Sequence, residues 1–341
     1  MDIDHLSFDS ESEESVEIVS NRNEQAPWLT EHASSITNPN LRLHTELIDF
    51  YHYIRPSKQE LELKRKTFNQ VKSLLEEKFP DSKVLPYGSF ATQIFLPNSD
   101  IDIVIVSNEQ KNNQRLLNKC GRYLYEHNDL FTEVNVLRKA KVPIIKFRHK
   151  ETQIEFDLAI NELGGAIMVP EVLRSIESHP EIPYLLFPLK LFLRQRRLNN
   201  PYTGGLGSFL LFCMILAFLR EFKSKLIHSH NVSILMNISL SDYLINFLSF
   251  YGLEFKYRDY EIVMSEGGQI RRRDDEGIGF RLISPQDNGR DIGAQMFKFR
   301  DIFQVFKNRF NVLTSTQMDP GESILAILLN PSRQKFKKYL E

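Results

Sequence analysis

Three aspartates and a Gly-Ser turn stand in an order that suits phosphoryl transfer. Asp100 and Asp102 lie two residues apart in an apolar run. They follow the pair Gly88-Ser89 and precede Asp157, which lies in a later apolar run. Because residues two apart on a β-strand point to the same face, the carboxylates of Asp100 and Asp102 can lie side by side. Hard cations such as Mg²⁺ prefer oxygen ligands. Three such acids can hold two metal ions, one that activates an attacking hydroxyl and one that binds a triphosphate.

Each of these pieces has a simpler explanation when it is taken alone. An Asp-x-Asp pair is more often a solvated strand edge than a metal site, and a Gly-Ser pair is usually only a turn. Their order along the chain favours a functional site instead. Ile101 and Ile103 alternate with the acids, so one face of this strand enters the core while the acids face a cleft.

The apolar periodicity predicts an α+β first half and a mainly helical second half. The first half should hold a mixed sheet, one strand of which carries Asp100 and Asp102. Its helices are expected at 40–55, 58–79 and 109–126, and its other strands at 84–85, 132–138, 142–148 and 153–160. Beyond Pro180 the predicted helices span 185–198, 204–222, 239–251, 295–310 and 321–330.

The composition is that of an intracellular protein with substantial cores. The chain has 341 residues, is 42% hydrophobic and contains 25 phenylalanines, which suits two domains. Its two cysteines, Cys120 and Cys213, exclude a disulfide framework and a cysteine-based zinc site. The longest apolar run, 209–219, is too short to span a bilayer, and we recognise no secretory signal. We therefore expect a reducing, intracellular compartment and no membrane association.

The charges are distributed unevenly around a net charge of −1. Residues 1–25 contain eight acidic residues and one basic residue, so the rest of the chain carries about +6. This first segment is rich in serine and acid and has little to bury, which predicts a disordered tail. The remaining body is only mildly basic, whereas a nucleic-acid binder that acts alone normally has a stronger positive field. The charge therefore suggests an RNA-binding partner.

At the Gly-Ser turn and the three aspartates, the chain resembles the DNA polymerase β-like nucleotidyltransferase superfamily. Within it, the sequence is most similar to the noncanonical poly(A) polymerases of the TRAMP type. The resemblance covers roughly residues 26–335. Further segments that fit this group are 26–29, 54–60, 143–147, 190–199 and 203–209.

The resemblance implies a nucleotidyltransferase catalytic domain with a mixed sheet, a mainly helical central domain, and an active site in the cleft between them. It also implies that an N-terminal helical segment packs on the central domain. The expected divisions are an acidic tail at 1–25, the helical segment at 26–63, the catalytic domain at 64–182 and the central domain at 183–341, with a nucleotide-recognition loop at 283–293.

Several residues are candidates for binding the triphosphate and the base. Gly88 and Ser89 can offer backbone N–H groups and a hydroxyl, since glycine permits close approach. Lys190 and Arg194 lie four apart on one helix face and can both reach a triphosphate, although a solvated face with a salt bridge is the simpler alternative. The resemblance implies that the pair Ser208-Phe209 binds phosphate and stacks on the base, with core packing as the alternative for the ring.

The remaining candidates are less specific. The resemblance places Asn161 at a position that can touch the sugar, and a loop-capping role is the alternative. Gly164, next to Gly165, gives the backbone room near the nucleotide or forms an ordinary turn. Asp291 belongs to the recognition loop, which departs from the family just before it, where relatives usually have asparagine.

Two charged segments have simpler explanations. The arginines at 271–273 are balanced by acids at 274–276, which is typical of a solvated loop. A basic C-terminal end could touch RNA or merely keep a helix end soluble. Its residues are Arg333, Lys335, Lys337 and Lys338.

These residues, together with the family that the chain resembles, predict a template-independent RNA 3′-end adenylyltransferase. It would add AMP from ATP with two Mg²⁺ (or Mn²⁺) ions held by Asp100, Asp102 and Asp157, and Asp157 would help to deprotonate the 3′-hydroxyl. The resemblance implies a nuclear enzyme that tags RNA for processing or decay by the exosome. It also implies two partners, a zinc-knuckle RNA-binding protein and an RNA helicase.

Two alternatives stay open. A terminal uridylyltransferase of the same family often uses a histidine in the recognition loop, but the last histidine here is His230, which favours ATP. A non-catalytic RNA-decay scaffold would have no need of three converging carboxylates. A templated DNA polymerase is disfavoured, because we find no hairpin-type DNA-binding segment ahead of residue 84.

Overall fold

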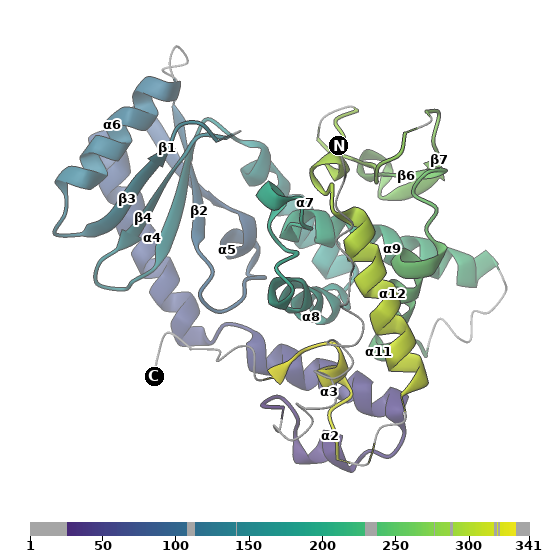
Figure 1. The fold of residues 1–341 in the computed structure, drawn as a ribbon. Helices are drawn as coiled ribbons and strands as arrows, with labels where there is room; N and C mark the ends of the chain where they lie inside the picture. Colours follow the sequence, from purple (N-terminus) through teal and green to yellow (C-terminus); the bar gives the residue numbers. More distant parts are fainter. Residues whose placement is uncertain are drawn as a thin grey trace, which may run out of the picture. The chain divides into compact units, whose positions relative to one another are not determined.

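The computed structural model describes residues 26–107, 113–140, 142–228, 237–275, 277–286, 289–316, 319 and 321–331. The predicted acidic tail and the basic residues from Arg333 to Lys338 lie outside this described part. The chain forms two compact units (Figure 1). Among the described residues, the sheet unit spans Ile54–Pro180, and the helical unit combines residues 26–53 with residues 181–331. The predicted domain bounds stay predictions.

The sheet unit is built on a mixed sheet of five strands in the order β1-β2-β5-β4-β3. The strands are β1 (Ser82–Tyr87), β2 (Ile101–Ser107), β3 (Phe131–Leu137), β4 (Ile144–His149) and β5 (Glu155–Ile160). β2 and β5 pair in parallel, whereas every other neighbouring pair is antiparallel. This confirms the predicted α+β class with a mixed sheet. It also puts the two acid-bearing segments on adjacent strands.

Two of the four described helices of this unit cover the face of the sheet opposite the acids. The helices of the unit are α4 (Lys58–Lys78), α5 (Gly88–Thr92), α6 (Asn113–Glu126) and α7 (Gly164–Ser178). Apolar side chains of α4 and α6 share one core cluster with Ile101, Ile103 and Ile105 of β2. Because side chains alternate along a strand, Asp102 and Val104 point to the opposite face. Val104 joins a second, smaller cluster there.

The helical unit contains six α-helices and a small sheet in its described part. The helices are α2 (Glu31–Ser35), α3 (Pro39–Ile54), α8 (Ile182–Gln195), α9 (Ser208–His228), α11 (Leu240–Ser249) and α12 (Phe299–Ser315). The strands β6 (Tyr260–Val263), β7 (Gln269–Arg272) and β8 (Leu282–Ile283) form a sheet in the order β7-β6-β8. The helix predicted at 321–330 is only the short 3₁₀ turn η5 (Leu325–Ile327). Among the described helices, none is long and apolar enough to cross a bilayer.

A buried carboxylate joins the first helices of the helical unit to its last segment. Glu46 of α3 is fully buried and accepts hydrogen bonds from the Ile324 N–H at 2.8 Å, the Leu325 N–H at 3.1 Å and the Ser323 hydroxyl. The indole N–H of Trp28 donates to the same Ser323 Oγ at 3.3 Å. Burial raises the pKa of Glu46, and the three donors partly oppose that rise. The N-terminal segment is thus fixed to this unit by hydrogen bonds as well as by packing.

Replacing Glu46 with alanine should strongly destabilise the helical unit. The change leaves three buried donors without an acceptor, which we expect to lower the free energy of unfolding by about 2–4 kcal/mol. Urea denaturation measures the effect. The control is Glu62→Ala, at an exposed position on α4, which should cost less than about 0.5 kcal/mol. Similar losses in the two variants would contradict a structural role for Glu46.

A buried histidine lies at the end of β4 in the sheet unit. His149 is 2% exposed, and its Nδ1 accepts from the Thr152 N–H at 3.3 Å. Its Nε2 is buried without a hydrogen-bond partner among the described residues. Burial lowers the pKa of His149, and the nearby Glu151 partly opposes the shift. The folded protein therefore holds this imidazole neutral.

Acid should destabilise the sheet unit through His149. Below about pH 6.5 the unfolded chain takes up a proton on this imidazole that the folded state resists, so the free energy of unfolding falls as the pH decreases. The loss should be smaller in His149→Asn, whose amide oxygen can replace Nδ1 as the acceptor for Thr152. Urea denaturation at about pH 7 and about pH 5 tests this. His52→Asn, at an exposed position, should keep the wild-type pH dependence.

Candidate active site

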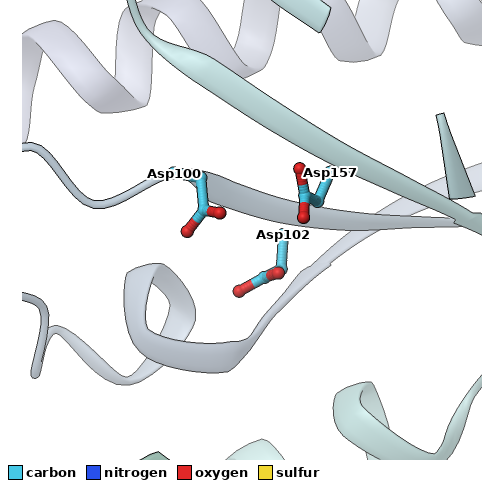
Figure 2. Close-up of side chains that lie close together, drawn as sticks. All are labelled: Asp100, Asp102 and Asp157. Atoms are coloured by element: carbon cyan, nitrogen blue, oxygen red, sulfur yellow. The ribbon is translucent and has the colours of Figure 1, made fainter. Parts of the chain in front are cut away.

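The pairing of β2 with β5 brings the three acids together. Asp102 and Asp157 are register partners on these parallel strands, and Asp100 directly precedes β2. One carboxylate oxygen from each residue lies within 4.8 Å of the other two. Figure 2 shows the three carboxylates gathered around one space. Among the residues that the structure describes, this is the one group of three or more side chains that could hold a metal ion.

The Gly-Ser turn lies directly against this cluster. Gly88 follows β1 and begins α5, with a left-handed φ of +63°. A Cβ added to Gly88 would lie 2.4 Å from Asp102 Oδ2, so a side chain there would displace the carboxylate. The conformation and the close approach both require glycine. Gly88 is therefore placed beside Asp102, and Ser89 follows it in the first turn of α5.

The donor set fits a hard divalent cation. All three groups offer oxygen, and all are half-buried, which weakens the screening of their mutual repulsion by water. Burial raises the pKa of Asp157, and the charge of Asp100 adds to the rise, while Lys146 opposes it. A cation in this space would relieve both effects. The two cysteines are buried and their thiols have raised pKa values, so neither thiol is suited to act as a ligand.

Lys146 is a site residue that sequence reasoning missed. It faces Asp157 across the antiparallel pair of β4 and β5, and its Nζ donates to both oxygens, at 2.8 and 2.6 Å. Burial alone would lower the pKa of Lys146, but the hydrogen bonds and charge of Asp157, together with Asp100 and Glu155, raise it overall. Pairing the predicted strands 142–148 and 153–160 as a hairpin, and reading which residues face each other, could have found this pair.

A second lysine, Lys64 of α4, was also missed. It is 2% exposed, and its ammonium group donates to the carbonyl of Ser99, the residue before Asp100. Burial lowers the pKa of Lys64 to about 8, while the charges of Asp100, Glu60 and Asp102 oppose the shift. Nothing in the local sequence of α4 indicates this contact, because it depends on how the helix packs.

The two other nucleotide candidates of the sheet unit have structural contacts. Asn161 has a left-handed φ of +56°, its Oδ1 accepts from the Ser107 N–H at 2.9 Å, and its Nδ2 donates to Asn113 at 2.7 Å. Asn161 therefore joins the end of β2 to the start of α6. These contacts are of the kind that a loop-capping role requires. Gly164 begins α7, which sequence reasoning did not predict. A Cβ on the adjacent Gly165 would lie 2.5 Å from the ring of Tyr87.

The remaining candidates belong to the helical unit. Lys190 is half-buried and Arg194 is exposed on α8, while Ser208 and Phe209 are both exposed in the first turn of α9. The ring of Phe209 is 39% exposed and nearly parallel to that of Phe212, with centroids 6.5 Å apart. This exposure does not favour core packing for Phe209. The structure describes each unit by itself, so the meeting of these residues with the acids stays a prediction.

Asp291 shapes the recognition loop. Its Oδ1 accepts from the backbone N–H groups of Leu282 at 3.1 Å, Gly293 at 2.8 Å and Ala294 at 3.2 Å. Its backbone also forms a bridge with Ile283. The carboxylate thus holds the two ends of the loop together, and a contact between Asp291 and the base stays a prediction. The loop residues 287 and 288 lie outside the described part.

The arginine segment at 271–273 is not a solvated loop. The side chain of Arg273 is 4% exposed and donates to the carbonyls of Tyr257, at 3.1 Å, and Gly279, at 2.7 Å. Arg271 belongs to β7 and pairs with the buried Glu261 on β6 at 2.7 Å. Charge balance alone suggested solvation, but these arginines instead brace the small sheet.

Replacing Asp100 and Asp102 together with asparagine tests the metal site. Without divalent ions, the melting temperature should hold or rise, because two like charges leave a half-buried cluster. Added Mn²⁺ should raise the melting temperature of the wild type but not that of the double variant. Thermal unfolding in EDTA and in Mn²⁺ measures both effects. The control pair, Glu126→Gln with Asp129→Asn, removes two exposed acids of the same unit and should respond to Mn²⁺ like the wild type.

Comparison with known proteins agrees with this geometry. A family model described as "Poly(A) RNA polymerase, mitochondrial-like, central palm domain" matches residues 43–169. The chain is 32% identical over 326 residues to Poly(A) RNA polymerase protein 1 of Eremothecium gossypii, a match that covers 92% of this chain and 51% of the relative. It is also 31% identical over 234 residues to the inactive noncanonical poly(A) RNA polymerase protein Trf4-2 of Drosophila melanogaster, covering 67% of this chain and 56% of the relative. The chain thus spans about half the length of the relatives it matches.

A solved structure matches most of the chain. The polymerase core of TRAMP, an RNA surveillance complex, superposes with a TM-score of 0.75 at 30% sequence identity. The match covers 90% of this chain and 100% of that core. The match covers the whole of that solved core, and the mixed sheet brings the three acids together. The chain therefore belongs to the TRAMP-type family of noncanonical poly(A) RNA polymerases, within the DNA polymerase β-like nucleotidyltransferases.

Proposed function

We propose that the protein is a template-independent RNA 3′-end adenylyltransferase that adds AMP from ATP and releases pyrophosphate. The observation that carries this proposal is the convergence of three carboxylates from β2 and β5 within 4.8 Å, directly beside Gly88. A poly(A) RNA polymerase relative and the solved TRAMP core support the choice of RNA and adenylate. One relative of similar identity is called inactive, so family membership alone does not establish catalysis.

Asp100, Asp102 and Asp157 would hold two divalent ions, Mg²⁺ or Mn²⁺. Bound there, the ions would supply activation of the 3′-hydroxyl and neutralisation of the triphosphate charge. Asp157 would help to take up the proton of the hydroxyl as a general base. It must first loosen its contact with Lys146. The side chain of Lys146 is 46% exposed, so it has room to move toward solvent.

The nucleotide would be bound by residues from both units. Ser89 offers its hydroxyl beside the acids, and the missing side chain of Gly88 lets the triphosphate approach the backbone. Lys190, Arg194 and Ser208 would neutralise and bind its phosphates. The exposed ring of Phe209 would stack on the base. The lesser candidates are Asn161 for the sugar, Gly164 for backbone room and Asp291 for the base.

The cellular role follows from the same resemblance. We propose that the enzyme is nuclear, that it tags RNA for the exosome, and that a zinc-knuckle RNA-binding protein and an RNA helicase accompany it. Two observations support partners of this kind. The solved core comes from TRAMP, an RNA surveillance complex. The chain beyond residue 25 carries only about +6, and few phosphate contacts give weak, salt-sensitive RNA binding.

ATP should be the preferred substrate of the purified protein. Incubation with labelled oligo(A), Mg²⁺ and each single nucleoside triphosphate should extend the RNA with ATP, and far less with UTP, GTP or CTP. Base choice rests on a few hydrogen bonds of about 1–3 kcal/mol each, so the preference should be graded. The Asp100→Asn/Asp102→Asn variant should not extend RNA. Equal use of UTP and ATP would favour the uridylyltransferase, and no incorporation at all would favour the scaffold.

Arg290→His offers a test of the same choice by gain of function. Arg290 stands just before Asp291 and contributes its backbone carbonyl to the loop by accepting from the Ser284 N–H at 2.8 Å, so a new side chain there leaves this contact intact. A histidine at this position should raise the ratio of UTP to ATP incorporation. Arg290→Gln is the matched control, since it changes the charge without adding an imidazole. An unchanged ratio in Arg290→His would remove the recognition loop as the element that reads the base.

A further inference from the structure

Lys64 is buried in a position where lysine is rarely found. It lies in the second turn of α4 and is 2% exposed, whereas its helix neighbours Arg65 and Lys66 are exposed. Burying an ammonium group is costly unless it is paired and hydrogen-bonded. The sequence therefore retains a charged group where an apolar one would pack at lower cost, and the contacts of its Nζ indicate why.

The Nζ of Lys64 reaches the turn that leads into the first acid. It donates to the carbonyl of Ser99, and it lies 5.0 Å from the centroid of the Phe95 ring. The turn itself is tight, because the Ser99 N–H bonds to the Leu96 carbonyl at 3.1 Å and Asn98 has a left-handed φ of +63°. The carbonyl held by Lys64 belongs to the peptide unit that also contains the Asp100 nitrogen.

The helix that carries Lys64 is itself well fixed. Ser57 and Glu60 form a capping box at its start, with bonds of 2.6 Å from the Ser57 N–H to the Glu60 carboxylate and 3.1 Å from the Glu60 N–H to Ser57 Oγ. Further along, Phe68 and Val71 enter the core under the sheet. Lys64 thus joins a capped helix, packed on the core by one face, to the backbone of Asp100.

Charge adds to this mechanical link. Asp100 and Asp102 both act on Lys64 electrostatically, in the direction that favours its charged form. In return, the positive charge of the buried ammonium group offsets part of the repulsion among the carboxylates. It acts from the side of the core. Lys146 does the same for Asp157 from the solvent side, with a side chain that can move away. Lys64 is buried and bonded to the Ser99 carbonyl, so its side chain has no comparable room to move.

We propose that Lys64 is a positioning residue of the three-acid cluster. Through the Ser99 carbonyl it fixes the backbone that carries Asp100, and its charge lets the carboxylates converge. This inference rests on the proposed nucleotidyl transfer. It predicts a division of effects: loss of Lys64 misplaces Asp100 and lowers kcat, but it does not weaken metal binding, because removing a nearby positive charge favours a cation.

The test compares Lys64→Met, Lys64→Arg and the control Lys66→Met, which removes an exposed lysine of the same helix. At saturating ATP and Mg²⁺, folded Lys64→Met should lose about 10- to 100-fold in kcat, the size of effect that a small misplacement of a reacting group can produce. The Mg²⁺ concentration for half-maximal rate should not increase. Lys64→Arg should recover part of kcat, and Lys66→Met should match the wild type. Wild-type kcat in folded Lys64→Met would overturn the inference.

A second measurement needs no activity. In metal-free protein, Lys64→Met should lower the urea midpoint less in an Asp100→Asn background than in the wild type, because the lysine has then lost one of the charges it offsets. Equal falls in the two backgrounds would show that Lys64 acts only as a core residue and would also overturn the proposal. If Lys64→Met does not fold, Lys64→Gln removes the charge and keeps an amide donor, and the metal-free comparison of the two backgrounds is made with it instead. Absence of wild-type RNA extension would instead contradict the proposed function, and the metal-free cycle would still decide the coupling.

Discussion

Repulsion among three carboxylates is the constraint on which the sheet unit depends. Asp100, Asp102 and Asp157 present oxygens within 4.8 Å of one another on half-buried strands, where water screens their charges poorly. The structure offsets this with two lysines of different character. Lys146 pairs with Asp157 from an exposed position, and Lys64 lies under Asp100 in the core. A cluster that is costly without a cation is, for the same reason, well suited to bind one.

The sequence predicted the structure best where the evidence lies within a few neighbouring residues. The alternation of Ile101 and Ile103 with acids predicted both the strand and the face of the sheet to which each side chain points. The helix α7 was missed because Gly164-Gly165 suggested a turn and Pro170 lies inside the helix. The small sheet was missed because its strands have only two to four residues, too few for periodicity to show. Lys64 and Lys146 escaped notice because their contacts depend on tertiary packing and register.

Residues chosen for their resemblance to a family proved to serve the scaffold as well. Asn161 joins β2 to α6, and Asp291 closes the recognition loop through three backbone N–H groups. Side chains of this kind hold their loops in shape with the same atoms that could meet a ligand. A substitution there would therefore change loop geometry first, so a loss of activity alone would not identify a nucleotide contact.

The hydrogen bonds between Glu46 and residues 323–325 have a consequence for synthesis on the ribosome. The backbone donor of Glu46, Ile324, lies 278 residues further along the sequence, whereas every strand of the five-stranded sheet lies between these two positions. The sheet unit is a continuous insertion, and it can fold as soon as it emerges. The helical unit is divided, so its first helices must wait, with the Glu46 carboxylate uncompensated, until the last segment has been translated. Nascent chains stalled before residue 323 should therefore contain a finished sheet beside an unfinished helical partner, an intermediate suited to recognition by chaperones.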